Sequence, residues 1–458
     1  MDVLKIKKSF IAESKKESKP RVLVDYFDEY ISVKSIMHGL NQSVLDSFES
    51  IYNHLNIDQS IQDLFQEKVV NLSENQPALH WQCRQQDVLS ENDLIKSIEI
   101  LKADLLSKNI KNIVNLGIGG SFEGPKLLIE SLTYLPSHKF NYFFITGSDP
   151  AEIEELLNQC DFSETVFIVS SKSLNTIETI TNFNIAKEWV LRNSKSSKKE
   201  IMDSFFAVTA NKDRAKELGF LDENVYSFAK EIGGRYSIWS AISLPAIIEL
   251  GNEFIDFLSG ANKADLEIRK NINYIKTLKT LSFADIWNSN YLGKNIKVIL
   301  PYSWKLRSIS DYLQQLEMES LGKRPHPDSI FISTSQTIYG GFGPSAQHSY
   351  FQMLHQGTSN TAADLIYVDN KKSKKSLTNS QAQIQSDLFI NSPEEIKGTK
   401  LEVNSNISVN LFRLNELTPF TLGYLLASWE HKVFISAQML QINPFDQFGV
   451  EAGKFLMD

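Results

Sequence analysis

Short apolar runs alternate with helical patterns through the middle of the chain. The runs that predict strands lie at 112–118, 140–146, 165–170 and 204–209. The stretches that predict helices follow them at 123–132, 149–159, 175–192 and 211–218. Continuous apolar strands in regular alternation with helices are typical of a parallel sheet with crossover helices. This part of the chain therefore predicts an α/β domain.

A second α/β pattern begins near residue 285. Its predicted elements are strands at 296–303, 328–334 and 365–369, a helix at about 306–321 between the first two, and a long helix from Thr418 to about Leu440. No repeat of fixed period accompanies the similarity of architecture, so two similar domains are expected rather than a solenoid.

The first 95 residues show helical patterns, such as VLDSFESIYNHL, without clear strand alternation. They predict a helical arm or layer. The expected organisation is this arm over 1–95, one α/β domain over 96–250, and a second over 251–458 that ends in a helical segment. The predicted fold class is α/β, with two doubly wound parallel-sheet domains.

Composition narrows the classes of partner and compartment. The chain has 458 residues, of which 42% are hydrophobic and 22% charged, as in ordinary globular proteins. A formal net charge of −8 argues against a nucleic-acid partner, because phosphate-backbone binding normally needs a basic face. Cys83 and Cys160 show no CxxC or Cys/His spacing, so neither a disulfide framework nor a metal site is predicted.

The hydropathy pattern also bears on membranes and secretion. The N-terminal segment is charged and lacks an apolar core of the kind that signal peptides have. No uncharged apolar stretch reaches the roughly 18 residues that a membrane-spanning helix needs. With only two cysteines and no disulfide pattern, the chain is expected to be cytoplasmic and without a membrane partner.

Two segments combine a buried strand with a turn of small residues that opens a helix. They are IVNLGIGGSFEG at 113–124 and TVFIVSSKSLNTIET at 165–179. A helix start leaves backbone N–H groups unpaired and carries a positive dipole end, so glycines and hydroxyls there suit phosphate oxygens. The glycines of these turns are Gly117, Gly119 and Gly120, the hydroxyl residues are Ser170, Ser171, Ser173 and Thr176, and Lys172 lies inside the second turn.

Either segment taken alone also fits a turn that binds no phosphate. The glycines suit an ordinary tight turn, and the hydroxyls suit ordinary helix N-caps. A dinucleotide site is disfavoured, because Phe122 stands where its fingerprint needs glycine. A nucleotide-binding P-loop is disfavoured as well, because no Gly-Lys-Ser/Thr closes the first segment.

Four further residues have side chains suited to proton transfer or charge stabilisation. Arg235 follows a double glycine, Glu319 lies near the end of a predicted helix, His348 follows a loop of small residues, and Lys454 lies near the last residue. Each also suits an ordinary structural role: a salt bridge, a solvated carboxylate, a core histidine and a surface lysine. Together with a phosphate cradle, they supply what a proton-shuttling sugar-phosphate enzyme requires.

Six ordered segments resemble the glucose-6-phosphate isomerase family, from about residue 70 to 454. They are GIGGSFEGP (117–125), SSKSLNTIET (170–179), GGRYSIWSAISL (233–244), QLEMESLGK (315–323), AQHSYFQMLHQGT (346–358), and LTPFTLGYLLASWEHKVF (417–434) with INPFDQFGVEAGK (442–454).

The resemblance implies two sugar-isomerase (SIS-type) domains, a role for each candidate residue, and no cofactor or metal. The substrate phosphate would be bound by Ser121, Ser171, Lys172, Ser173 and Thr176, with Gly120 of the glycine loop beside them, and the sugar would be contacted by Gln447. His348 and Lys454 would assist ring opening. Glu319 would move a proton between C2 and C1 through a cis-enediol, while Arg235 would steady the enediolate. The family works as a homodimer, in which the histidine matching His348 reaches the neighbouring subunit's site.

The chain departs from the family pattern in several places. Ser173 replaces a threonine, Leu174 and Asn175 replace phenylalanine and threonine, and Leu321 replaces asparagine. Pro344 and Ser345 alter the loop before His348. Two alternatives to a glucose 6-phosphate/fructose 6-phosphate isomerase follow: a non-catalytic sugar-phosphate-binding protein on the same fold, or an isomerase that also accepts mannose 6-phosphate.

Overall fold

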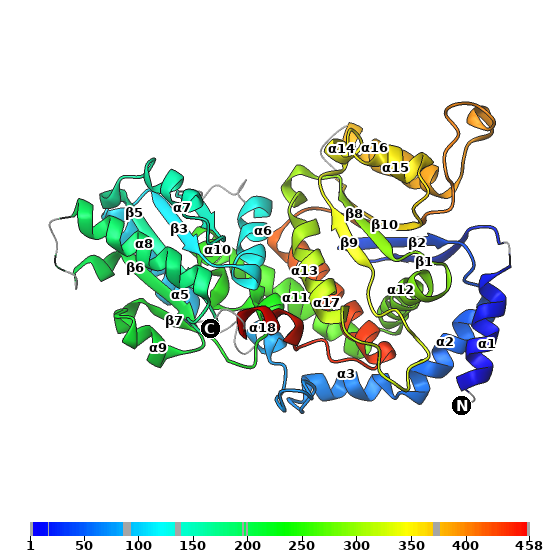
Figure 1. The fold of residues 1–458 in the computed structure, drawn as a ribbon, viewed down its shortest axis with the longest axis horizontal. Coiled ribbons are helices and arrows are strands. Elements are labelled where there is room, and N and C mark those ends of the chain that lie inside the picture. Colours follow the sequence, from blue (N-terminus) through cyan, green and yellow to red (C-terminus); the bar gives the residue numbers. More distant parts are fainter. Residues whose placement is uncertain are drawn as a thin grey trace. The chain divides into compact units, whose positions relative to one another are not determined.

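The computed structural model describes residues 3–16, 18–85, 93–132, 139–194, 197, 200–369 and 376–455. The chain forms two compact units, and most of their helices and strands are labelled in Figure 1. The continuous unit is the single segment Leu79–Ser259. The discontinuous unit combines Met1–Ala78 with Gly260–Asp458.

The continuous unit contains a five-stranded, fully parallel sheet in the order β4-β3-β5-β6-β7. Its strands are β3 (Asn112–Leu116), β4 (Asn141–Ile145), β5 (Thr165–Ser170), β6 (Phe205–Thr209) and β7 (Val225–Ser227). The four strands predicted for this region are confirmed, and the short edge strand β7 was not predicted. The parallel strands, with helices between them, confirm the α/β class.

Helices connect these strands and precede or follow them. They are α5 (Asp93–Ser107), α6 (Glu123–Leu132), α7 (Pro150–Leu157), α8 (Ile177–Asn193), α9 (Lys212–Glu217), α10 (Leu244–Leu250) and the start of α11 (Glu253–Lys270). Short 3-10 turns complete the unit: η1 (His80–Arg84), η2 (Gly119–Ser121), η3 (Phe162–Glu164), η4 (Glu200–Ser204), η5 (Asp222–Asn224), η6 (Gly234–Trp239) and η7 (Ala241–Ser243).

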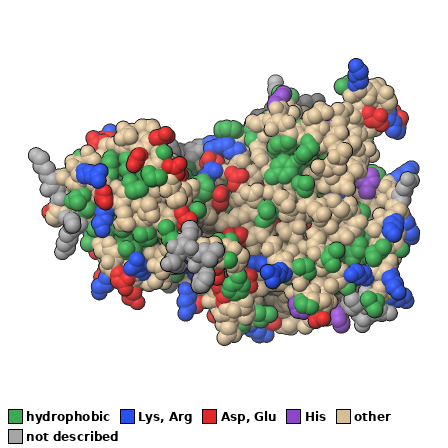
Figure 2. Space-filling model, viewed as in Figure 1, with side chains coloured by type: hydrophobic (Ala, Val, Ile, Leu, Met, Phe, Trp, Pro, Cys, Tyr) green, Lys and Arg blue, Asp and Glu red, His purple; other side chains and the backbone are tan. Residues whose placement is uncertain are grey.

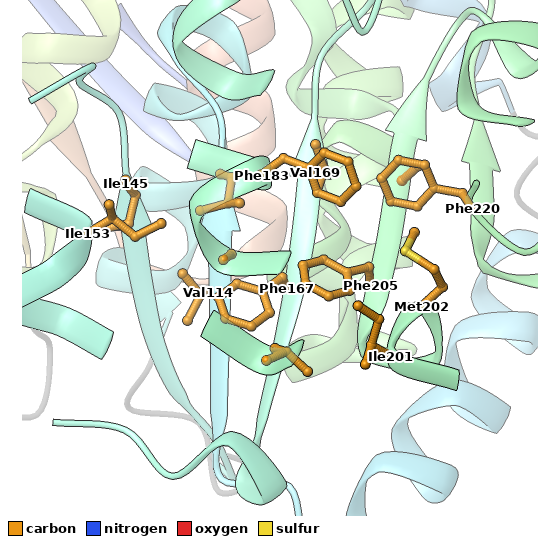
Figure 3. Close-up of a cluster of buried hydrophobic side chains, with 14 of the residues drawn as sticks. Val114, Ile145, Ile153, Phe167, Val169, Phe183, Ile201, Met202, Phe205 and Phe220 are labelled. Carbon is orange, nitrogen blue, oxygen red and sulfur yellow. The ribbon is translucent and has the colours of Figure 1, made fainter. Parts of the chain in front are cut away.

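A cluster of buried apolar side chains holds the sheet of the continuous unit to its helices (Figure 3). Phe167 of β5 stacks on Phe205 of β6 with ring centroids 5.0 Å apart, and Phe183 of α8 meets Phe205 edge-on at 5.4 Å. Every residue of β5 and β6 is buried. Strands buried on both faces explain the continuous apolar runs in the sequence.

The discontinuous unit contains a six-stranded mixed sheet in the order β1-β2-β11-β10-β8-β9. Its strands are β1 (Arg21–Phe27), β2 (Ile31–Met37), β8 (Ile296–Pro301), β9 (Thr337–Gly340), β10 (Thr361–Val368) and β11 (Ser408–Leu414). β8, β9, β10 and β11 run parallel to one another; β8 and β10 confirm two predicted strands, whereas β11 was not predicted. β1 and β2 form a hairpin whose second strand pairs antiparallel with β11.

Two predictions about this unit are wrong. The first 95 residues do contain strands, namely β1 and β2. The segment 328–334 is not a strand, because the Asn290 side chain takes its backbone groups: Asn290 Oδ1 accepts from the N–H of Ile332 and Ser333, and Asn290 Nδ2 donates to the Ser333 carbonyl. The strand at that position in the sheet is β9, a few residues later.

The remaining elements of the discontinuous unit are mostly helical. The helices are α1 (Val3–Ser14), α2 (Gln42–His54), α3 (Ile57–Phe65), α12 (Ile272–Tyr291), α13 (Ile309–Leu321), α14 (Gly343–Ala346), α15 (Phe351–Gln356), α16 (Leu377–Ile390), α17 (Pro419–Leu440) and α18 (Phe448–Phe455), and the 3-10 turns are η8 (Trp304–Leu306) and η9 (Glu394–Ile396). The predicted helices near 306–321 and 418–440 are confirmed as α13 and α17.

Candidate functional site

The two small-residue loops lie side by side at one edge of the parallel sheet in the continuous unit. They follow β3 and β5, which are adjacent strands with Leu116 paired to Val169. A chain of polar contacts joins them: Ser170 Oγ donates to Asn115 Oδ1 at 2.9 Å, and Asn115 Nδ2 donates to the Ser121 carbonyl at 3.0 Å. The carboxyl ends of adjacent parallel strands are where α/β sheets bind ligands.

The loop after β5 is folded by its own hydroxyl groups. Ser171 Oγ accepts from the Leu174 N–H at 3.1 Å and lies 3.0 Å from Thr176 Oγ1. Leu174 has a left-handed backbone, with φ of +52°, and its side chain is fully buried in the apolar cluster between the sheet and its helices. The Lys172 carbonyl accepts from Thr209 Oγ1 and from the Ala210 N–H, both at 3.0 Å. The loop is therefore tied both to its own turn and to β6.

The start of α8 differs from an ordinary capped helix. Thr176 occupies the N-cap position, but its side chain makes no capping hydrogen bond and instead contacts the Ser171 hydroxyl. By contrast, Asn41 and Ser376 cap α2 and α16 in the usual way. The positive end of the 17-residue helix α8 thus opens towards the loop without a capping side chain, which suits an anion.

Arg235 lies beside this loop pair because η2 and η6 approach closely. A Cβ atom built on Gly120 would lie 2.0 Å from the carbonyl oxygen of Gly234, so only glycine permits the approach. Arg235 follows Gly234, is 2% exposed, and its guanidinium lies 5.4 Å from the centroid of the Tyr236 ring. The continuous unit therefore brings together seven of the predicted site residues: Gly120, Ser121, Ser171, Lys172, Ser173, Thr176 and Arg235.

The other four predicted residues belong to the discontinuous unit. Glu319 lies in the last turn of α13, as predicted, and Gly322 ends that helix with its N–H bonded to the Met318 carbonyl. The Glu319 side chain is half-buried, and its Oε2 lies 3.3 Å from Gln315 Nε2. It is thus held on one side of the helix end and remains partly accessible.

A polar cluster connects the end of α13 to the segment that carries Gln447. Lys323 Nζ donates to Asp446 Oδ1 at 2.8 Å, Ser73 Oγ donates to Asp446 Oδ2 at 2.7 Å, and Asn443 Nδ2 donates to Asp446 Oδ2 at 3.0 Å. Gln447 is half-buried and immediately precedes α18. Neither Lys323 nor Asp446 is predicted from the sequence, because their spacing of 123 residues gives no local signal.

The remaining two predicted residues differ in how they are placed. Lys454 belongs to α18 by its backbone, and its side chain lies outside the part of the chain that the structure describes. His348 lies in a turn between α14 and α15, and its side chain is exposed. Pro344 occupies the first turn of α14, where proline is well tolerated, so this departure from the family pattern fits the helix start.

The discontinuous unit contains a large cavity that none of the predicted site residues lines. It has a volume of about 880 Å³ and is lined by residues of β1, α2, α3, α11 and α12. Over the described ranges, no group of three or more His, Cys, Asp or Glu side chains is arranged to hold a metal ion. Among the same residues, no helix has both the length and the apolar character needed to cross a bilayer.

Charge on the molecular surface agrees with the composition of the chain. On the face drawn in Figure 2, Lys and Arg side chains are interspersed with Asp and Glu rather than gathered in one basic field. Nucleic-acid-binding surfaces typically concentrate basic side chains.

Comparison with known proteins identifies the family. The family model of phosphoglucose isomerase matches residues 36–458. The chain belongs to the phosphoglucose isomerase family. The match includes every predicted site residue and leaves residues 1–35, with β1 and most of β2, outside it. The resemblance seen in the sequence is thereby confirmed.

Curated members of the phosphoglucose isomerase family align along most of the chain. Glucose-6-phosphate isomerase from Legionella pneumophila (strain Lens) is 34% identical over 472 aligned positions, which cover 96% of this chain and 92% of that protein. Glucose-6-phosphate isomerase from Pseudomonas fluorescens is 33% identical, covering 91% and 83%.

A solved structure supports the same family fold. The crystal structure of a glucose-6-phosphate isomerase from Chlamydia trachomatis superposes with a TM-score of 0.79 at 25% identity, covering 99% of this chain and 90% of that one. The predicted sugar-isomerase fold class is confirmed, with the mixed sheet of the discontinuous unit as the difference from expectation.

Proposed function

We propose that this chain catalyses the reversible isomerisation of glucose 6-phosphate to fructose 6-phosphate. The enzyme is then an aldose–ketose isomerase of glycolysis and gluconeogenesis. The observation that carries the proposal is the family match over residues 36–458, which contains the whole set of predicted anchor, acid and base residues. The coincidence of family membership with an uncapped helix start beside two small-residue loops supports a phosphorylated substrate.

The phosphate of the substrate is held by the continuous unit. Ser121, Ser171, Ser173 and Thr176 donate hydroxyl hydrogen bonds, Lys172 supplies a cation, and Gly120 allows the backbone of η2 to approach. The support is local: the two loops are joined through Asn115, and the positive end of α8 opens towards them. A binding site made from rigid strand ends keeps the rest of the sugar in one orientation.

The acid and base groups then act on the other end of the sugar. His348 and Lys454 assist ring opening, and Gln447 contacts the sugar. The Glu319 carboxylate removes the proton from C2, the electron pair of the C2–H bond becomes the C1=C2 double bond of the enediol, and the π pair of the C1 carbonyl moves to O1, which takes up a proton. O2 then gives up its proton as the C2 carbonyl forms, and the double-bond pair takes the proton back from Glu319 to make the new C1–H bond. The Arg235 guanidinium stabilises the negative oxygen that develops meanwhile.

A coupled assay for fructose 6-phosphate formation tests the reaction, and Glu319→Gln tests the base. We expect the variant to lose about 10²- to 10⁴-fold in kcat, the usual contribution of a general base, while it still binds substrate in calorimetry. A five-carbon aldonate phosphate, which resembles the enediolate, should bind more tightly than the substrate. Binding without turnover by the unmodified protein would instead favour the non-catalytic sugar-phosphate-binding function.

The active form is proposed to be a homodimer in which His348 serves the neighbouring subunit. The exposed position of His348 in the turn before α15 supports this arrangement. Co-expression of Glu319→Gln with His348→Ala tests it. A shared site should restore about a quarter of the activity, because half of the dimers are mixed and each mixed dimer has one intact site. No recovery would show that each subunit uses its own histidine.

The compartment is proposed to be the cytoplasm. The support is that Cys83 and Cys160 are not in a disulfide, as is usual where thiols are kept reduced. Fractionation of cells that express the chain with a small C-terminal tag would test this directly.

A further inference from the structure

Five charged side chains meet inside the discontinuous unit, and the proposed reaction uses none of them. They come from five different elements: Asp285 of α12, Lys297 of β8, Glu317 of α13, Asp364 of β10 and Lys432 of α17. Lys297 Nζ lies 3.0 Å from Asp285, 2.8 Å from Glu317 and 3.6 Å from Asp364, and Lys432 Nζ lies 2.9 Å from Asp285 and 2.8 Å from Glu317.

Glu317 is the most tightly held member of this network. Its Oε2 accepts from Lys297, and its Oε1 accepts from Lys432 at 2.8 Å and from Trp429 Nε1 at 2.5 Å. Burial alone would raise the pKa of Glu317, but the ammonium groups of Lys297 and Lys432 have the larger effect and lower that pKa from 4.5 to about 2. Glu317 is therefore a fixed anion with three donors, 3% exposed.

Buried ion pairs are a poor source of stability, because removing charges from water costs about as much as their attraction returns. Well-packed apolar side chains would stabilise α13 equally well. A network of this kind is instead suited to holding one element in a single orientation, because a small displacement leaves a charge buried without its partner.

The element so held is the helix that carries Glu319. Successive helical residues are about 100° apart around the axis, so Glu319 projects from nearly the opposite side of α13 to Glu317. Rotation of α13 about its axis would move the Glu319 carboxylate, and the same rotation would pull Glu317 away from all three donors. Because Glu317 and Glu319 are only two residues apart on the same helix, the position of one carboxylate fixes the position of the other.

We propose that Glu317, together with Lys297 and Lys432, is a positioning residue that fixes the rotation of α13 and thereby aims Glu319 at the substrate carbons. The inference rests on the proposed function for its catalytic consequence. Proton transfer demands accurate placement of the base, and a displacement of about 1 Å can cost on the order of 100-fold in rate. The charged network supplies that accuracy from the side of α13 that the substrate does not contact.

Three substitutions separate positioning from general stability. Glu317→Gln removes the charge of the central carboxylate and keeps its shape. Trp429→Phe removes one donor to Glu317 and is the milder variant, which carries the test should Glu317→Gln not fold. Asp265→Asn is the matched control. Asp265 is 2% exposed, against 3% for Glu317, lies in the same unit and contacts His431 of α17 at 2.9 Å, but it is carried by α11.

The first measurement is steady-state turnover. Glu317→Gln should lower kcat by about 10- to 100-fold, as loss of a group that orients a catalytic group typically does, with KM changed by less than about 2-fold. Trp429→Phe should show a smaller loss in kcat, and Asp265→Asn should show none. Equal losses of kcat in Glu317→Gln and Asp265→Asn at equal loss of stability would overturn the proposal, as would unchanged kcat in Glu317→Gln.

The second measurement is the fate of deuterium at C2 of glucose 6-phosphate. A well-aimed carboxylate returns part of the deuterium to C1, whereas a loosely held one exposes it to exchange with water. The fraction retained in fructose 6-phosphate should therefore fall in Glu317→Gln and Trp429→Phe and stay at the wild-type value in Asp265→Asn. A retained fraction equal in all three variants would overturn the proposal.

The third measurement does not depend on catalysis. Amide hydrogen exchange in residues 309–321 should be faster in Glu317→Gln and Trp429→Phe than in the wild type or in Asp265→Asn. Faster exchange in both test variants would support the fixation of α13 by Glu317. An unmodified protein without isomerase turnover would refute only the proposed function and would leave this result standing. Unchanged exchange in 309–321 for both test variants would refute the fixation itself.

Discussion

The close approach of η2 to η6 makes Gly120 the most restrictive position in the continuous unit. A Cβ atom at Gly120 would lie 2.0 Å from the Gly234 oxygen and 2.2 Å from the Gly234 carbonyl carbon, where ordinary contacts begin at 3.4 Å. Both partners are backbone atoms, so no side-chain rotation relieves the clash. Gly120→Ala must therefore move η2 and η6 apart by about 1.4 Å, which is the difference between the 3.4 Å of an ordinary contact and the 2.0 Å from the Cβ atom to the Gly234 oxygen.

The cost of that movement can be estimated. Overpacking a well-packed interior costs about 1–3 kcal/mol, and a backbone-on-backbone clash lies at the upper end of that range. Replacing glycine by alanine restricts the unfolded chain and returns about 0.4–1 kcal/mol. The expected net loss is about 2 kcal/mol. Because Arg235 follows Gly234, its guanidinium moves with η6, and kcat/KM should fall by on the order of 100-fold.

Urea denaturation followed by tryptophan fluorescence measures the stability, and Trp239 within η6 places one reporter at the altered contact. The matched control is Gly234→Ala, whose Cβ would meet no atom within 4 Å. Its denaturation midpoint should equal or exceed that of the wild type. A Gly120→Ala protein with the midpoint of the Gly234→Ala control and the turnover of the wild type would refute the reasoning.

Three further predictions concern other parts of the molecule. Leu174→Gly relieves a left-handed backbone that costs about 1–2 kcal/mol, but it removes a fully buried side chain that contributes about 2–5 kcal/mol. We therefore expect a lower stability in urea denaturation, and a more stable variant would contradict this balance. Burial lowers the pKa of Lys294 to about 8 from 10.5, so the unfolded chain binds more protons between these pH values. The free energy of unfolding should rise with pH across that window by up to about 3 kcal/mol relative to Lys294→Met, and equal slopes for the two proteins would contradict it. Asp446→Asn weakens a hydrogen bond from Lys323 worth about 1.5–3 kcal/mol beside Gln447, so KM for the sugar phosphate should rise, and an unchanged KM would show that this cluster does not position Gln447.

The sheet of the continuous unit could be predicted because burial on both faces leaves an unambiguous signal. Every residue of β5 and β6 is buried, and the intervening helices have their own periodicity. The hairpin of β1 and β2 was missed for the opposite reason. β1 is an edge strand whose Val22 and Phe27 are 53% and 77% exposed, so its sequence shows no alternation between core and solvent. The place of the hairpin in the sheet is decided by the pairing of β2 with β11, which the local sequence pattern does not contain.

A side chain, rather than a strand partner, explains the false strand at 328–334. Phe331 is buried and Ile332 is 72% exposed, an alternation typical of a strand. The hydrogen bonds of that backbone go to Asn290 instead, which lies about 40 residues earlier on α12. Sequence patterns report which side chains are apolar, but they do not report where backbone donors find acceptors.

The candidate site shows the same division. The loops after β3 and β5 were predictable because small residues between a strand and a helix have few other uses, and their common sheet edge follows from parallel topology. The network around Glu317 was not predictable, because Lys297 and Lys432 are 20 and 115 residues away from it. Charged residues that pair in the interior are indistinguishable in sequence from solvated ones.

The pairing of β2 with β11 has a consequence for how the polypeptide is made. Val33 pairs with Phe412, so the inner edge of the hairpin finds its neighbour only after nearly the whole chain has left the ribosome. The continuous unit ends at Ser259, well before β11 is synthesised. Synthesis from the N-terminus therefore favours folding of the continuous unit first. Until β11 is made, the β1–β2 hairpin has an unpaired strand edge, and such an edge is a template for pairing with other chains. Nascent chains stalled before β11 should accordingly depend most on chaperones.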